Sequence, residues 1–401
     1  MPPMNAIRPL APALALLLLA PACQDPPAPA PAPASASTPA APPPTASVAA
    51  PASASTPASA PTLGSFGELV RTLSEPGGEF FSDNLISNET SYLQVAGALS
   101  ARPEGGVYIG VGPEQNFTYI ALTRPRYAFI VDIRRDNLLQ QLWYKALFEG
   151  AESRAHFLAL MLGRPHDAAK APPEGASIDE ILSYTKKNSP DEKLYTETLT
   201  RVTARIEGPY GVALDGKDKQ ALVELTRAFF DKGLDLRFEL KESSSRRYPS
   251  LGELFAATDP QGKKGGFLAS DEAFRLIKRM HGEGRIVPLV GNFAGDGALP
   301  ALAALLRKNG LSVSTFYVSN VEQYLLDPPV WSKWLRNVKA LPAASDAVFV
   351  RCYLDQGKKH PRQMDGHRTA TVLQRMGDFV EREEKSPSRS FWKISTEGVL
   401  E

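Results

Sequence analysis

Residues 107–135 read VYIGVGPEQNFTYIALTRPRYAFIVDIRR, and the rest of the chain is best interpreted outward from them. The apolar runs GVYIGV and YAFIVDI are typical of buried strands. Gly110-x-Gly112 closes the first run, and Asp132 stands near the end of the second, 22 residues after Gly110. In doubly wound folds such glycines let the backbone approach a ligand, while an acid at this position accepts hydrogen bonds from ribose hydroxyls. The stretch therefore predicts a βαβ unit that binds a nucleoside.

Strand and helix patterns alternate along the rest of the chain. Further strands are predicted in RIVPLVGNF, SVSTFYVSN and AVFVRCY, and a helix is expected over residues 365–384. Residues 151–235 have mostly helical patterns. Strands separated by helices imply a mostly parallel sheet covered on both faces. We therefore expect one α/β domain over residues 64–401, with a doubly wound, mostly parallel, Rossmann-like sheet and a helical insertion at about 150–260.

The residues after the glycines narrow the class of ligand. Pro113, Glu114 and Gln115 follow where a dinucleotide site needs a third glycine, and the Glu114 carboxylate would repel a pyrophosphate. The chain has no G-x-x-x-x-G-K-[ST] motif, which excludes P-loop chemistry. A ligand with adenosine but no phosphate fits better, and S-adenosylmethionine is the obvious candidate.

Two resemblances point the same way. YIGVGPE followed by FIVDI resembles the first two motifs of class I methyltransferases, except that Tyr108 stands where an acidic residue often begins the first motif. Longer strings, among them SDNLISNETSYLQV, VPLVGNFAGDGAL and FYVSNVEQYL, resemble a bacterial family that includes lipoproteins and has a methyltransferase-like fold. This resemblance covers roughly residues 80–340. It implies a methyltransferase-like sheet but no reaction, because no reaction is settled for that family.

The carboxyl ends of the predicted parallel strands meet at one rim, where open α/β sheets bind ligands. We expect the cofactor to contact residues at or near this rim: Gly110, Gly112, Glu114, Asn116, Asp132, Asn292 and Asn320. Three acids are candidate catalytic residues by location alone: Glu89, Asp296 and Glu322.

These candidates also have purely structural interpretations. Asp132 could cap the helix that follows it, and Asn292 and Asn320 could be turn formers. Glu89 could stand in the first turn of a helix through ETSYLQVAGAL, where a carboxylate is favourable. Glu322 could be an ordinary first-turn residue. The sequence leaves both interpretations open.

Residues 1–23 predict the export signal of a bacterial lipoprotein. Their apolar stretch is too short to span a bilayer comfortably, and small residues follow it. LAPAC resembles a lipobox, in which Cys23 would be lipidated, although APA also fits an ordinary signal-peptidase site. Residues 24–63 are rich in Pro, Ala and Ser, so we expect a disordered tether. By resemblance to the lipoprotein sorting rule, Gln24 favours the outer membrane of the cell envelope, facing the periplasm or the surface.

Composition excludes several classes of function. A formal net charge of +1 leaves no basic excess for binding nucleic acid. The 2 cysteines exclude a disulfide scaffold, and the 5 histidines have no metal-ligand spacing, so we expect no metal. Cys352 lies in an apolar strand pattern and is expected to be a buried, unreactive thiol.

Two main functions remain. The chain either binds a small, adenosine-containing ligand without catalysis, or is an active S-adenosylmethionine-dependent methyltransferase whose acceptor the sequence does not name. S-Adenosylmethionine is a cytosolic metabolite that an exported protein would not normally meet, which favours binding. Another enzymatic activity is the third alternative, since a fold does not dictate a function.

Overall fold

The computed structural model describes residues 62–239, 247–388 and 390–400. The predictions for the signal segment, for Cys23 and for nearly all of the tether lie outside these residues. In the described part of the chain, no helix is both long enough and apolar enough to cross a membrane.

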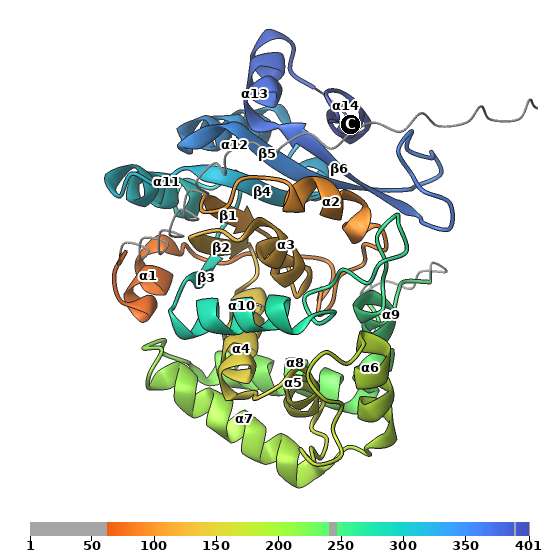
Figure 1. The fold of residues 1–401 in the computed structure, drawn as a ribbon. Helices are drawn as coiled ribbons and strands as arrows, with labels where there is room; N and C mark the ends of the chain where they lie inside the picture. Colours follow the sequence, from red (N-terminus) through yellow and green to blue (C-terminus); the bar gives the residue numbers. More distant parts are fainter. Residues whose placement is uncertain (1–61, 240–246, 389, 401) are drawn as a thin grey trace, which may run out of the picture. The chain divides into compact units, whose positions relative to one another are not determined.

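The described strands form one six-stranded sheet in the order β3-β2-β1-β4-β5-β6 (Figure 1). Neighbours from β3 to β5 are parallel, and β6 is antiparallel to β5 at the edge. The strands are β1 (Val107–Gly110), β2 (Tyr127–Asp132), β3 (Ile286–Val290), β4 (Val313–Ser319), β5 (Ala343–Leu354) and β6 (Thr369–Arg375). The prediction of an α/β fold with a mostly parallel sheet is confirmed.

The order of the strands reverses at β1. The chain moves from β1 to β2 and β3, then returns to the other side of β1 to form β4. The crevice beyond the carboxyl ends of β1 and β4 is therefore a topological switch point, the usual place for a ligand in open α/β sheets.

Helices cover both faces of this sheet (Figure 1). Because parallel crossovers are right-handed, the connections from β1 to β3 lie on one face and those from β3 to β5 on the other. The helices are α1 (Phe66–Leu73), α2 (Ala96–Ser100), α3 (Gln115–Thr123), α4 (Arg135–Gly150), α5 (Arg154–Leu162), α6 (Ile178–Lys187), α7 (Glu192–Glu207), α8 (Gly216–Lys232), α9 (Leu251–Phe255), α10 (Asp271–Gly282), α11 (Ala298–Lys308), α12 (Pro328–Ala340), α13 (Met376–Lys385) and α14 (Phe391–Thr396), with short 3₁₀ turns η1 (Tyr92–Val95), η2 (Gly233–Asp235) and η3 (Val321–Tyr324).

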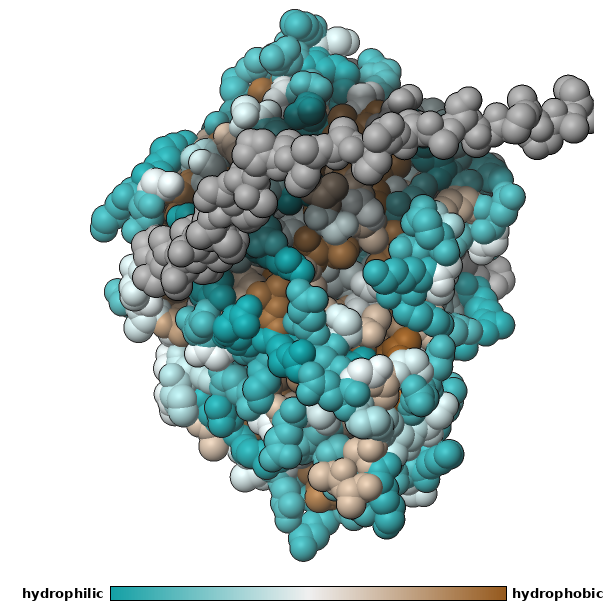
Figure 2. All heavy atoms as spheres, in the orientation of Figure 1, coloured by the Kyte–Doolittle hydropathy of each residue, from teal (hydrophilic) through white to brown (hydrophobic). Residues whose placement is uncertain are grey.

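The connection from β2 to β3 is long and helical, from α4 to α10. Helix α4 lies between the sheet and the helices α7 and α8, so most of its side chains are buried. Strands β1, β2 and the edge strand β3 are buried along their whole length, as expected for a sheet with helices on both faces. The surface in Figure 2 is mainly hydrophilic, with hydrophobic residues in small patches.

Two expected helices differ from the structure. Residues 365–384 hold strand β6 and then α13, because β-branched Thr369, Thr371 and Val372 favour a strand and β6 pairs with β5 along its whole length. The segment ETSYLQVAGAL forms η1 followed by the five-residue α2 instead of one continuous helix. Glu89 therefore precedes these short elements and does not lie in the first turn of a helix.

Candidate functional site

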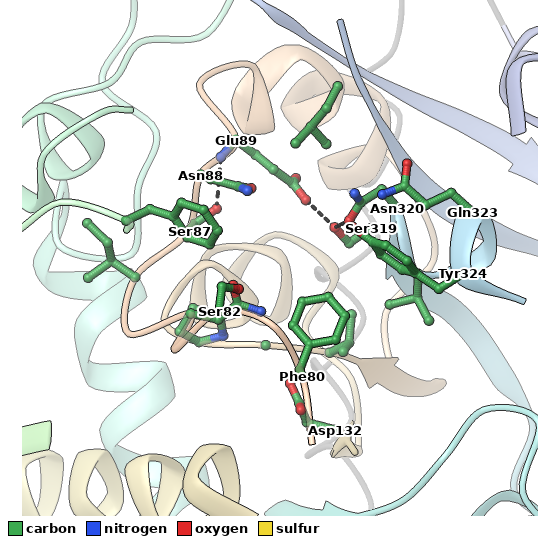
Figure 3. A pocket seen from close by; sticks show the side chains of 18 of the residues that line it. Phe80, Ser82, Ser87, Asn88, Glu89, Asp132, Ser319, Asn320, Gln323 and Tyr324 are labelled. Carbon is green, nitrogen blue, oxygen red and sulfur yellow. Dashed lines mark hydrogen bonds between the residues drawn. The ribbon is translucent and has the colours of Figure 1, made fainter. Parts of the chain in front are cut away.

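Two adjoining pockets lie at the carboxyl edge of the sheet. The smaller pocket, about 210 Å³, lies beyond β1 and β4, between the irregular segment 80–89 and residues 317–324 (Figure 3). The larger pocket, about 650 Å³, lies beyond β2 and β3. The two share seven lining residues: Phe80, Phe81, Asn84, Val111, Asp132, Val321 and Tyr324. The pockets therefore form one composite site, and its volume suits a small organic ligand.

Glu89 is the buried acid of the smaller pocket, with an exposed fraction of 1%. Its Oε2 accepts a hydrogen bond of 2.8 Å from Gln115 Nε2. Its Oε1 accepts a bond of 2.8 Å from the Tyr317 hydroxyl and another from the Ser319 hydroxyl. Figure 3 shows the Glu89 side chain pointing across the pocket to Ser319. A strand, a helix and the irregular segment thus fix this carboxylate in one position.

Burial dominates the electrostatics of Glu89. It raises the pKa of Glu89 above its ordinary value of 4.5, because the charged form loses its hydration. Hydrogen bonds from Gln115, Ser319, Tyr317 and the Cys352 thiol act in the opposite direction but do not cancel the effect. The thiol is itself buried, and burial raises the pKa of Cys352 well above 9.0, which agrees with the expected unreactive cysteine.

The two glycines after β1 serve different purposes. A Cβ on Gly110 would lie 2.0 Å from Asn116 Oδ1, so this glycine makes room for a neighbouring side chain. Asn116 donates to the carbonyls of Val111, Gly112 and Pro113 at 2.9, 3.1 and 2.8 Å and thereby fixes the loop. Gly112 has a φ of 80° and lines the smaller pocket, where its missing side chain leaves the backbone open. Gly110 and Asn116 line neither pocket and act by positioning the loop.

Asp132 lines both pockets at the end of β2 and is 5% exposed. It does not cap α4 through the first turn of the helix. Instead its Oδ1 accepts a bond of 2.9 Å from the Arg134 backbone, and the Arg134 guanidinium lies beside both carboxylate oxygens. Arg134 also donates to the Asp83 carbonyl, which ties the irregular segment to this edge. The carboxylate is thus held in place and still borders the site.

A carboxylate also organises the loop that contains Asn292. Glu75 accepts from the backbone N–H of Asn292 at 2.6 Å and of Gly297 at 2.8 Å. A Cβ on Gly295 or Gly297 would lie within 2.4 Å of the same carboxylate. The glycines of this loop therefore accommodate Glu75, while Asn292 lines the larger pocket. Asn320 lines the smaller pocket.

Three other predicted site residues line neither pocket. Glu322 is fully buried in an ion pair with Arg351, at 2.8 Å from Oε1 to Nη2, and also accepts from Trp334. Asp296 forms exposed ion pairs on the surface. Glu114 accepts from the Ser87 backbone at 3.1 Å, and its second oxygen is buried without a hydrogen-bond partner. Of the three catalytic candidates, only Glu89 borders the composite site.

Backbone strain collects at the smaller pocket. In the described part of the chain three residues other than glycine have positive φ, and two of them, Asn84 at 45° and Ser319 at 53°, line this pocket. Asn tolerates the left-handed region, but Ser does so at a cost. Such strain persists where the surroundings fix it, which is common at binding sites. The left-handed turn directs the Ser319 hydroxyl to Glu89.

A family model matches residues 85–397, and its description is Domain of unknown function (DUF7790). The chain belongs to this family. No curated protein matches it in a comparison of sequences. The DUF7790 region contains Glu89, Asp132 and Ser319, whereas Phe80 and Phe81 lie just before it.

Sequence reasoning missed several residues at the site of this DUF7790 protein. Phe80, Phe81 and Tyr324 stand between the two pockets, with ring centroids 4.2–5.6 Å apart. Segment 80–89 is irregular, so it has no helical or strand period that could reveal which side chains face the site. The signal in the sequence was the pair Phe80-Phe81 within a polar stretch. Ser319 lies directly before the predicted Asn320, and only the structure places its hydroxyl on Glu89.

Proposed function

We propose that the chain binds a small, adenosine-containing ligand in the composite site, with S-adenosylmethionine as the first candidate. The observation that carries the proposal is the position of Asp132, at the end of β2 and on the border of both pockets. A nucleoside in the larger pocket would place its ribose beside this carboxylate. The remainder of the ligand would extend past Gly112 into the smaller pocket.

The residues of the site fit such a ligand. The larger pocket has a volume of about 650 Å³, within the range of about 300–1,000 Å³ typical of small-molecule sites. A Cβ on Gly112 would meet no atom within 4 Å, so the backbone there is accessible to a ligand. The aromatic rings of Phe80 and Tyr324 border both pockets and offer surfaces on which a purine could stack. This arrangement also supports the expectation of a methyltransferase-like fold.

Calorimetric titration with S-adenosylmethionine and S-adenosylhomocysteine tests the proposal. A carboxylate that accepts hydrogen bonds from a ligand contributes about 1.5–3 kcal/mol, so Asp132→Ala should weaken binding by about tenfold to a hundredfold. Asp132→Asn keeps the shape beside Arg134 and controls for misfolding. Asp296→Asn changes an exposed acid away from both pockets and should bind like the wild type. Absence of heat and of a thermal shift at millimolar ligand would refute the proposal.

We further propose that this binding protein is a lipoprotein of the bacterial outer membrane, anchored through Cys23. The support is the LAPAC string and the Pro/Ala/Ser-rich tract directly after it. A tether of about 40 residues would allow the domain to reach roughly 35 Å from the membrane.

An active methyltransferase is the second candidate, and the specific observation in its favour is Glu89. S-Adenosylmethionine supplies an electrophilic methyl group when bound. A carboxylate whose pKa is raised by burial could take a proton from an acceptor in the smaller pocket. Formation of S-adenosylhomocysteine with an envelope extract as the source of acceptor, lost in Glu89→Gln, is the expected result for an enzyme. Equal rates with both proteins would exclude this role for Glu89.

A further inference from the structure

Among the residues that the structure describes, the Glu89 carboxylate has no cationic partner in the smaller pocket. Its hydrogen-bond partners Gln115, Tyr317 and Ser319 are all neutral donors. Among the described residues that line the pocket there is no Lys, Arg or His. This differs from Asp132 and from Glu322, each of which has an arginine beside it.

A buried carboxylate without a counter-charge is costly. Neutral donors satisfy the lone pairs of its oxygens, but the charge stays in a space from which most water is excluded. Glu89 is 1% exposed, so solvent screens it weakly. A positively charged group that enters the pocket would remove this cost and would bind correspondingly well.

The lining of the pocket suits an organic cation. Phe80, Tyr317 and Tyr324 contribute aromatic rings to the lining of the pocket, and the Tyr317 hydroxyl contacts the carboxylate. Among the described large hydrophobic residues only three are markedly exposed, and two of them, Phe81 at 49% and Tyr324 at 45%, line this pocket. Aromatic faces attract ammonium and sulfonium groups through their quadrupole, and cages of such rings recognise quaternary ammonium ligands. Phe81 and Tyr324 pack on each other and on Phe80, and their exposed surfaces are available to a ligand.

The same geometry disfavours a metal ion. A hard cation needs several acceptor oxygens around it, whereas the neighbours of Glu89 direct N–H and O–H groups at its carboxylate. In the described part of the chain no group of three or more His, Cys, Asp and Glu side chains could hold a metal ion.

We propose that the smaller pocket binds an organic cation, an ammonium or sulfonium group on a short chain, with Glu89 as its counter-ion. The inference rests on the proposed function only in that the larger pocket holds the nucleoside. The cation has two chemical sources, either the charged part of the adenosine ligand itself or a second, amine-containing molecule beside it.

Three adenosine derivatives test the first source. S-Adenosylmethionine carries a sulfonium, an ammonium and a carboxylate group, S-adenosylhomocysteine carries the ammonium and the carboxylate group but no sulfonium, and 5′-methylthioadenosine carries none of these charges. Calorimetry on the full chain gives Kd for each. Glu89→Gln should weaken binding of the charged ligands by about tenfold to a hundredfold and leave 5′-methylthioadenosine unchanged within about twofold.

Choline and its neutral isostere 3,3-dimethylbutan-1-ol test the second source, in the presence of saturating 5′-methylthioadenosine. If the cation belongs to a second molecule, choline should bind at least tenfold more tightly than the alcohol, and Glu89→Gln should abolish the difference. Tyr317→Phe is the matched control, because it removes one neutral donor and keeps the charge. In that variant the preference for cations should persist, and melting temperatures of both variants report on folding.

The outcomes separate the two proposals. If no adenosine derivative binds but choline shows a preference that Glu89→Gln abolishes, the proposed function fails and the cation site stands. If the adenosine derivatives bind and Glu89→Gln affects charged and neutral ligands equally, the cation site is wrong and the proposed function stands. Binding of none of these probes by a folded chain overturns both.

Discussion

Replacing Glu114 by Gln should remove a penalty on folding that grows with pH. The Glu114 carboxyl is buried at the start of α3, with one oxygen bonded to the Ser87 backbone and the other without a partner. Burial raises the pKa of Glu114 from 4.5 to about 7. The folded state binds the proton of the Glu114 carboxyl more tightly than the unfolded state does. Protonation therefore stabilises the folded state fully below about pH 4.5, and this stabilisation is lost as the pH rises through about 7.

The size of the effect follows from the shift. A pKa that rises from 4.5 to about 7 corresponds to about 3 kcal/mol at about 1.4 kcal/mol for each pH unit. Above pH 7 the ionised Glu114 carboxylate stays buried, and its Oε2 has no hydrogen-bond donor to stabilise the charge. Gln has nearly the same shape and no charge, so the variant avoids this penalty at every pH.

Denaturant unfolding of the full chain at several values between pH 5 and pH 8 measures the difference directly. We expect the unfolding free energy of the wild type to fall by about 2–3 kcal/mol relative to Glu114→Gln over this interval, because part of the effect already develops below pH 5. Glu174→Gln is the matched control, because Glu174 is an exposed carboxylate in a surface ion pair with Arg275. Its pH profile should run parallel to that of the wild type.

Parallel profiles for the wild type and Glu114→Gln would refute this reasoning. They would mean that water or a rearranged Ser87 segment reaches the second carboxylate oxygen and stabilises its charge. A difference that grows as the pH falls would reverse the sign and contradict the argument from burial.

The remaining predictions concern the core and the anchor. Glu322→Gln leaves the Arg351 guanidinium buried without its counter-charge, so the free energy of unfolding should fall by about 3–5 kcal/mol in a urea titration. An unchanged midpoint would show that the pair contributes nothing net. The full-length chain should sediment with membranes, while Cys23→Ala should be recovered in the soluble fraction. Equal solubility of the two proteins would contradict lipidation.

The elements that the sequence predicted well are those with a local signal. The runs around β1 and β2 are continuous, apolar and separated by a short helix, so their type and approximate bounds follow from composition. Strand β6 was wrongly predicted as helix although its β-branched residues favour a strand, because the segment is short and lies directly before α13. Its pairing with β5 agrees with that local preference.

The candidate site divides along similar lines. Gly112, Asp132 and Asn320 follow or end strands and line the pockets. Their position was predictable because the carboxyl ends of parallel strands lie together at the same edge of the sheet. Spacing does not determine the direction of a side chain one turn further on. Glu322 follows β4 closely, yet it points to Arg351 and the indole of Trp334 instead of the pocket.

The long excursion between β2 and β3 has a consequence for how the chain reaches its native state. Strand β2 ends at Asp132 and its outer neighbour β3 begins only at Ile286, so the seven helices described in this connection are synthesised between two strands that must lie side by side. Until β3 has been synthesised, the outer edge of the apolar strand β2, YAFIVD, has no strand to pair with. Pairing across such a separation closes a large loop and is slow, and exposed edges of this kind aggregate. Nascent chains that stop short of residue 290 should therefore aggregate more readily than the full-length chain, in which β3 covers this edge.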